Sequence, residues 1–166
     1  MKGKYLILGS NVEPRTRHLQ LAREMINVQV GPVLRSSSIY QTEPWGYSDQ
    51  PAFLNQVTQV NTDLNAFETL KTILEIEKSI GRIRNGKWRE RTIDIDILYF
   101  EDEVINSESL LVPHPGIPFR NFVLIPLCEL IPGEIHPVLK VSNAELLKAT
   151  DDILGVVKVT GQPASR

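Results

Sequence analysis

Apolar side chains along the chain form short runs, separated by polar segments that contain glycine and proline. Four runs have the length and the β-branched or aromatic content of strands. These predicted strands cover residues 5–8, 33–40, 53–62 and 93–100. The last run, IDIDILYF, alternates, so we expect Asp94 and Asp96 on one of its faces. Its other face then carries Ile93, Ile95, Ile97 and Tyr99.

Two longer segments have helical spacing instead. Pro14 can occupy the first turn of a helix that continues until Gly31-Pro32 stops it. Asn65, with Glu68 three residues later, resembles a capping box and predicts a helix over residues 66–80. Its predicted buried stripe consists of Phe67, Leu70, Ile73 and Leu74.

Glu77 continues that buried stripe, so its carboxylate is expected on or near an apolar face. A carboxylate in such a place needs a partner. It could pair with an arginine of the following loop or hold a ligand group, or it could be an ordinary residue at a helix edge.

The C-terminal third contains shorter elements. Pro118 and Pro126 can each begin a short helix, and Ser142 with Glu145 forms a capping box for a helix to about residue 149. A last strand is expected over residues 156–159. The order strand, helix, strand, strand, helix, strand, then short helices is typical of the α+β class. We therefore predict a ferredoxin-like two-layer sandwich with a mainly antiparallel sheet, helices on one face and the other face available for a ligand.

Length and composition fit one domain over residues 1–166. Cys128 is the only cysteine, so an intramolecular disulfide is impossible, and its apolar neighbours favour a small core residue. No apolar run reaches the length of a signal peptide core or a membrane span. We expect a soluble cytoplasmic monomer.

A cationic loop precedes the strand that carries Asp94 and Asp96. Glu90 is its only acidic residue, and its basic residues are Arg82, Arg84, Lys87, Arg89 and Arg91. Because the net charge of the chain is -2, this cluster indicates a local anionic partner rather than general affinity for nucleic acid.

The α-carbons of Asp94 and Asp96 should lie about 7 Å apart, so both carboxylates can lean toward a common point, where they repel each other unless a cation lies between them. Mg²⁺ suits such a pair, because it takes oxygen ligands from carboxylates and substrate phosphates. Arginines beside a carboxylate-bound metal are typical of phosphoryl transfer. The alternative is a solvent-facing strand edge beside a solvated turn.

Three further features leave alternatives open. Trp45 and Tyr47 lie in a predicted loop over residues 41–50, where aromatic side chains either fold onto the core or meet a ligand. Phe53 and Asn55 share a strand face and offer a stacking surface beside an amide, or are a core and a surface residue. His114, between two prolines, is structural or donates to a phosphate.

Taken together, six segments resemble 6-hydroxymethyl-7,8-dihydropterin pyrophosphokinases of folate biosynthesis, in that family's order and spacing. They are GSN at 9–11, YQTEP at 40–44, DQPAFLN at 49–55, RTIDID at 91–96, VPHP at 112–115 and RNFVL at 120–124. Several separate motifs in register are far more specific than any one of them.

The resemblance implies transfer of the terminal pyrophosphoryl group of ATP to the pterin's hydroxymethyl oxygen, leaving AMP. Asp94 and Asp96 would hold two Mg²⁺ ions, and Arg82 and Arg91 would complete the catalytic set by neutralising phosphates. Nucleotide contacts would come from Glu77, Arg82, Arg84, Trp88, Arg91, Ile97, His114 and Arg120. Phe53 and Phe122 would sandwich the pterin, and its edge would meet Thr42, Pro44, Trp45 and Asn55.

The resemblance also implies that two loops, 43–50 and 82–91, close over the substrates and exclude water. The chain departs from the family at Arg89, Glu90 and Ser109, which changes the expected path of the arginine loop and weakens expected nucleotide contacts. Two other functions fit parts of the pattern. One is a non-catalytic module that binds nucleotide or single-stranded RNA, which the net charge and the paired aspartates disfavour. The other is a pterin enzyme of different chemistry, such as an aldolase, which would not need both carboxylates and the arginines.

Overall fold

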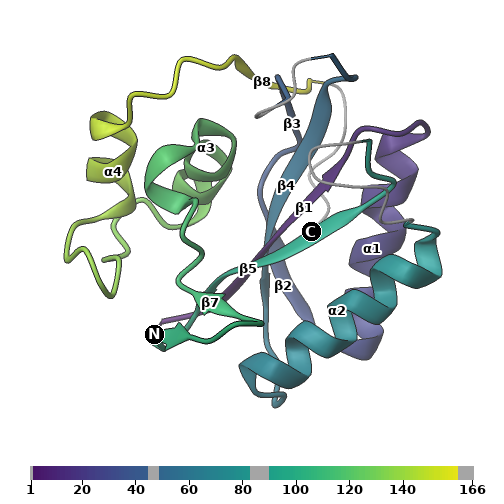
Figure 1. Ribbon diagram of the computed structural model, residues 1–166, viewed down its shortest axis with the longest axis horizontal. Coiled ribbons are helices and arrows are strands. Elements are labelled where there is room, and N and C mark those ends of the chain that lie inside the picture. The colour runs from purple at the N-terminus through teal and green to yellow at the C-terminus, as the bar shows by residue number, and fades with distance from the viewer. Residues whose placement is uncertain (1, 45–48, 83–89, 161–166) are drawn as a thin grey trace.

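A six-stranded antiparallel sheet forms the centre of the protein (Figure 1). The computed structural model describes residues 2–44, 49–82 and 90–160. The strand order is β5-β1-β4-β3-β8, and β2 also pairs with β4. The strands are β1 (Lys4–Ser10), β2 (Val33–Ser36), β3 (Tyr40–Thr42), β4 (Phe53–Val60), β5 (Asp94–Phe100) and β8 (Val156–Lys158). A separate two-stranded sheet joins β6 (Ile105–Asn106) and β7 (Leu111–Val112).

Helices cover both faces of the sheet. α1 (Arg15–Gln29) and α2 (Ala66–Ile80) lie on one face, and α3 (Asn121–Leu130) and α4 (Asn143–Ala149) lie on the other (Figure 1). A short 3-10 helix over Ile117–Phe119 precedes α3. The predicted α+β sandwich with a mainly antiparallel sheet is confirmed. Its detail of helices on one face only needs correction, because α3 and α4 pack on the face that was expected to be available for a ligand.

Each face of the sheet has its own apolar core. Leu6 and Leu8 of β1 belong to the core under α1 and α2, whereas Tyr5 and Ile7 belong to the core under α3 and α4. The alternation of a strand sends neighbouring side chains to opposite faces, so one central strand supplies both cores. This explains why β1 is buried along nearly its whole length.

Strand β5 breaks the alternation that its sequence predicts. Ile95 and Ile97 lie in the core under α2 as expected, but Tyr99 joins the core on the α3 side, next to Leu98. The cause is a shift in the pairing with β1, where Leu6 is opposite Ile97 and Tyr5 is opposite Tyr99. One residue is thus added to β5, and such a bulge reverses the faces beyond it. Asp94 and Asp96 precede the bulge and share a face.

The local signals of α2 are confirmed, but its buried stripe only in part, since Ile73 is buried and Leu70 packs against the core. Both halves of the Asn65 and Glu68 capping box are present, and the helix covers residues 66–80 as predicted. Phe67 and Leu74, expected inside, are 48 % and 38 % exposed. The helix is rotated so that another stripe faces the sheet, consisting of Ala66, Thr69, Ile73, Ile76 and Glu77.

Two further boundaries differ from the prediction. The segment 33–40 is divided, because Ser37 turns inward and its hydroxyl accepts a hydrogen bond from the Val57 backbone at 3.0 Å. Pro126 does not begin a helix but lies within α3, on its buried face with Val123 and Leu127. Packing against the sheet outweighs the local preference there. Across residues 2–44, 49–82 and 90–160, the helices lack the length and apolar character needed to cross a membrane.

Candidate active site

A pocket of about 240 Å³ lies between the sheet and the beginning of α3. Antiparallel pairing brings the end of β1 and the starts of β4 and β5 to the same end of the sheet. The pocket floor includes Ile7 and Leu98. Its other lining residues are Gly9, Thr42, Glu43, Gln50, Phe53, Asn55, Arg91, Asp94, Asp96, His114, Arg120, Phe122 and Val123.

The lining of this pocket combines two aromatic rings with an amide. Phe53 on β4 and Phe122 on α3 both line it, together with Asn55. Asn55 is only 5 % exposed, and its Nδ2 donates to Thr42 Oγ1 at 2.7 Å. Its Oδ1 lies over Gly9, where an added Cβ would approach to 2.6 Å. The amide is therefore oriented by Thr42 and has room only because residue 9 is glycine.

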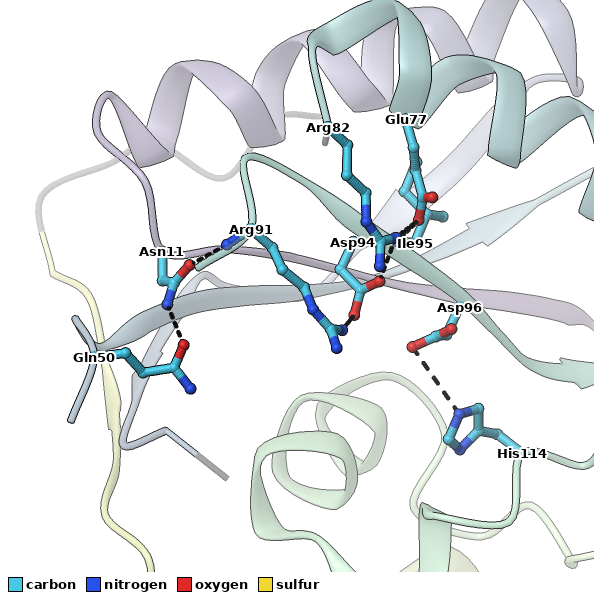
Figure 2. Close-up of polar contacts among 9 residues, drawn as sticks. All are labelled: Asn11, Gln50, Glu77, Arg82, Arg91, Asp94, Ile95, Asp96 and His114. Carbon is cyan, nitrogen blue, oxygen red and sulfur yellow. Dashed lines mark hydrogen bonds and ion pairs between the residues drawn. The ribbon is translucent and has the colours of Figure 1, made fainter. Parts of the chain in front are cut away.

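The acidic side of the pocket is organised around Asp94. Its Oδ1 pairs with Arg82 at 2.7 Å, and its Oδ2 pairs with Arg91 (Figure 2). Both contacts are charge-assisted hydrogen bonds, which are stronger than neutral ones. Arg82 and Arg91 lie at the two ends of the cationic loop, so Asp94 holds both ends of the loop beside the pocket.

Glu77 supports the same arrangement from α2. Its Oε1 lies 2.6 Å from Arg82 and accepts a hydrogen bond from the Ile95 backbone at 2.8 Å (Figure 2). Burial raises the pKa of Glu77, and the Ile95 hydrogen bond and the Arg82 charge oppose this. Of the alternatives that the sequence left for Glu77, the structure shows a pairing with an arginine of the loop.

Asp96 lies beyond Asp94 on the same face and points toward His114 (Figure 2). Burial in the pocket wall, followed by the negative charge of Asp94, raises the pKa of Asp96. Its side chain keeps 47 % of its surface accessible, and water that reaches this surface opposes the shift. The positive charges of Arg91 and Arg82 favour the ionised form of Asp96.

His114 is neutral at physiological pH, because burial lowers its pKa to about 4. Its Nδ1 accepts the Gly116 N–H at 3.0 Å, so the neutral ring carries its proton on Nε2. That nitrogen lies 4.0 Å from Asp96 Oδ2. His114 thus presents a hydrogen-bond donor, not a charge, at the boundary of the pocket.

The carboxylates of Asp94 and Asp96 suit a hard cation that takes its remaining ligands from substrate and water. Asp94 and Asp96 offer carboxylate oxygens on one face, and their mutual repulsion contributes to the raised pKa of Asp96. Within the described ranges, no group of three or more acidic, histidine or cysteine side chains could hold a metal. Mg²⁺ is usually bound by one or two carboxylates plus substrate phosphates and water, which this pair fits.

A second pocket of about 260 Å³ adjoins the first and shares Asp96 and His114 with it. Its walls are largely apolar, with Leu70 from α2 and Ile97 from β5. The remaining lining residues are Ile95, Glu108, Ser109, Leu110, Leu111 and Pro115. Two pockets therefore meet at one carboxylate and one imidazole.

Most of the residues that the sequence singled out converge on these two pockets. Ile97 lines the second pocket, and Arg120, Phe53, Phe122, Asn55 and Thr42 line the first. Arg82 contacts the lining residue Asp94, and Glu77 contacts Arg82. Six of the predicted residues lie outside the described ranges: Trp45, Tyr47, Arg84, Lys87, Trp88 and Arg89. Most of the two loops that were predicted to close over the substrates also lies outside them.

Sequence reasoning missed the role of Asn11. Asn11 is 2 % exposed, and its Oδ1 accepts the Arg91 N–H while its Nδ2 donates to Gln50 (Figure 2). The same Nδ2 also donates to the Pro51 carbonyl. It therefore joins the ends of both predicted loops. Its place directly after a buried strand, in the turn Gly9-Ser10-Asn11, was the available signal.

Comparison with known proteins gives consistent results. The family model of 7,8-dihydro-6-hydroxymethylpterin-pyrophosphokinase matches residues 5–132. The 2-amino-4-hydroxy-6-hydroxymethyldihydropteridine pyrophosphokinase of Bacillus subtilis is 44 % identical over 127 residues, which cover 76 % of each chain. The protein of the same name from Aquifex aeolicus is 40 % identical and covers 82 % of this chain and 84 % of its own.

Larger proteins contain a similar unit. The folic acid synthesis protein fol1 of Pneumocystis carinii is 37 % identical over 148 residues, which are 89 % of this chain but only 20 % of that protein. The solved structure of Plasmodium falciparum HPPK-DHPS has a TM-score of 0.71 at 19 % identity. The match covers 89 % of this chain and 43 % of that one. Because the sequence identity is low, this likeness supports the fold alone.

Proposed function

The chain belongs to the 7,8-dihydro-6-hydroxymethylpterin-pyrophosphokinase family and is a pyrophosphokinase of folate synthesis, and from this we propose the details of its reaction. It transfers the terminal pyrophosphoryl group of ATP to the hydroxymethyl oxygen of 6-hydroxymethyl-7,8-dihydropterin, with Mg²⁺, and releases AMP. The observation that carries the proposal is the pair of pockets that meet at Asp96 and His114. A transfer between two bound molecules needs this arrangement, because the reacting groups must be held together in a fixed orientation.

The first pocket accepts the pterin. Phe53 and Phe122 offer aromatic surfaces for a flat heterocycle, and the Asn55 amide, oriented by Thr42, pairs with the ring's polar edge. Pro44 and Trp45 lie two and three residues after Thr42 and are proposed to complete this edge. A polar edge read by a buried amide gives selectivity, because an analogue lacking the matching groups leaves that amide unpaired.

The second pocket accepts the nucleoside part of ATP. Leu70 and Ile97 supply an apolar surface for the base, and the triphosphate extends past His114 and Asp96 toward Arg82 and Arg91. His114 donates from Nε2, and Arg120 adds positive charge from the opposite wall. Arg84 and Trp88 are proposed to contact the nucleotide from the arginine loop.

Asp94 and Asp96 would hold Mg²⁺, which neutralises phosphate charge and eases deprotonation of the attacking hydroxyl. Arg82 and Arg91 both pair with Asp94, and we propose that they turn to phosphate oxygens when ATP binds. Glu77 keeps Arg82 in place during this exchange. The arginines then neutralise the charge that develops on the transferred group, which is the main demand of phosphoryl transfer.

The test is incubation of the purified protein with ATP, Mg²⁺ and the pterin, followed by chromatography of nucleotides and pterins. AMP should appear in step with the pterin diphosphate, and a chelator should stop both. Asp96→Ala should keep the fold and lower turnover by about a hundredfold or more, as for other groups that stabilise transition-state charge. Asp63→Ala is the control, because Asp63 is an exposed carboxylate that does not line either pocket.

Unchanged turnover in Asp96→Ala would overturn the metal assignment. Binding of ATP or pterin without AMP formation would indicate a binding module instead. The monomeric state and the cytoplasmic location expected from the sequence remain predictions, and light scattering of the purified chain tests the first.

A further inference from the structure

The segment that follows α4 connects the two walls of the first pocket. It crosses over α3 and reaches the sheet edge as β8, beside β3 (Figure 1). There, Val156 is paired with Thr42, and the Gly155 carbonyl accepts the Glu43 N–H at 3.1 Å. The segment thus holds the end of β3, from which Thr42 and Glu43 line the pocket.

The same segment completes the beginning of α3. Arg120 occupies the N-cap position with extended backbone, at φ −133° and ψ 112°. An arginine side chain has no acceptor, so it cannot bind the Asn121 N–H at the start of the helix. Asp152 does so instead, because its Oδ2 accepts the Asn121 N–H at 2.7 Å. Its carbonyl also accepts Asn121 Nδ2 at 2.8 Å.

The cap comes from a distant part of the chain. Asp152 lies 31 residues after Asn121, whereas the caps of α2 and α4 come from the residues directly before those helices. A carboxylate at a helix N-terminus also interacts favourably with the helix dipole. Loss of Asp152 would therefore act on the first turn of α3 before it acts on the rest of the fold.

The first turn of α3 is also part of the pocket wall. Arg120, Phe122 and Val123 all line the pocket, opposite Thr42 and Phe53. We propose that Asp152 is a positioning residue for the acceptor substrate: it holds the α3 wall at the distance from the β3 wall that a flat pterin ring requires. The proposal rests on the proposed function for the identity of the ligand. A preformed gap increases affinity, because the ligand does not have to order the wall when it binds.

The experiment measures pterin and ATP binding separately in wild type, Asp152→Ala, Asp152→Asn and Asp151→Ala. Asp151 is exposed and adjacent, so its variant removes the same charge without the cap. Asp152→Ala should weaken pterin binding by about three- to tenfold, because the first turn is then only partly formed in the free protein. ATP affinity should change clearly less than pterin affinity, since the second pocket does not include α3 and only Arg120, at the N-cap, is proposed to meet the phosphates.

Asp152→Asn keeps an oxygen acceptor and should restore most of the pterin affinity, and it also serves if Asp152→Ala folds poorly. Equal pterin affinity in wild type and Asp152→Ala would overturn the proposal, as would an equal weakening of both ligands. Backbone amide exchange at residues 121–124 gives a readout that needs no ligand. Faster exchange there in Asp152→Ala supports the positioning role, and unchanged exchange contradicts it, even if wild type failed to bind pterin and so disproved the proposed function.

Discussion

Asn11 and Arg91 bond to each other twice through groups 80 residues apart in the chain. The Asn11 Oδ1 accepts the Arg91 N–H at 2.6 Å, and the Asn11 N–H donates to the Arg91 carbonyl at 3.1 Å. The Asn11 Nδ2 donates to Gln50 Oε1 at 3.1 Å. One buried side chain therefore holds the end of the arginine loop against the end of the loop that precedes β4.

Replacing Asn11 by Ala should destabilise the protein and reduce turnover together. The Arg91 N–H would lose its acceptor in a part-buried place, which costs about 1–3 kcal/mol of unfolding free energy. Arg91 would also be held less firmly beside Asp94. Urea denaturation and steady-state kinetics measure the two effects.

Asn106→Ala, at an exposed position, is the matched control for Asn11→Ala. Asn11→Asp separates the two contacts, because it keeps the acceptor for Arg91 and loses the donor to Gln50. If Asn11→Ala had wild-type stability and turnover, the link between the loops would have no energetic importance.

Gly9→Ala should weaken pterin binding specifically. The new Cβ would lie 2.6 Å from Asn55 Oδ1, so the amide would have to leave its position beside Thr42. We expect a loss of about tenfold in pterin affinity, the size of one hydrogen bond to a buried group. Gly133→Ala is the control, since nothing lies within 4 Å of a Cβ at that site. Titration of pterin fluorescence distinguishes the variants, and equal affinities would show that Asn55 does not read the ligand edge.

Glu77 should be among the residues least tolerant of truncation. Glu77→Ala would remove the acceptor of the buried Ile95 N–H and leave Arg82 paired with Asp94 alone, and it should cost about 1–3 kcal/mol of unfolding free energy. Glu77→Gln keeps an acceptor and should cost clearly less. Glu75 lies on the same helix but is exposed, so Glu75→Ala should be close to wild type in the same thermal and chemical denaturation series. A similar stability for all three variants would contradict this account.

His136 should make folding stability depend on pH. Burial lowers its pKa, and its Nδ1 accepts the N–H groups of Val138 and Leu139 at 3.3 and 3.1 Å. The unfolded chain therefore binds a proton at higher pH than the folded protein does. Stability from this group is present above the ordinary histidine pKa of about 6.5 and is lost as the pH falls below it, by at most about 1.4 kcal/mol per pH unit.

His136→Asn keeps an acceptor near the Nδ1 position but does not titrate. As the pH is lowered from 7 to 5, the unfolding free energy of wild type should therefore fall by more than that of the variant. His114, whose pKa burial also lowers, remains in both proteins and contributes equally. A constant difference between variant and wild type across this range would show that His136 is not the titrating group.

Parts of this protein follow from the sequence alone, because the interactions that decide them are local. The Asn65 and Glu68 capping box and the apolar spacing after it predicted α2 over residues 66–80, as observed. Alternation along β5 placed Asp94 and Asp96 on one face, and the six motifs identified the family.

Contacts between distant residues decided the rest. Tyr99 faces α3 because pairing with β1 adds a residue to β5, and Glu77 accepts the Ile95 N–H only when α2 packs beside the start of that strand. The cap of α3 comes from Asp152 and the tie between the loops from Asn11, and in neither case does the local sequence identify the partner. Local propensities and periodicity are determined within a few neighbours along the chain, whereas register, face and remote hydrogen-bond partners depend on which elements the folded chain brings together.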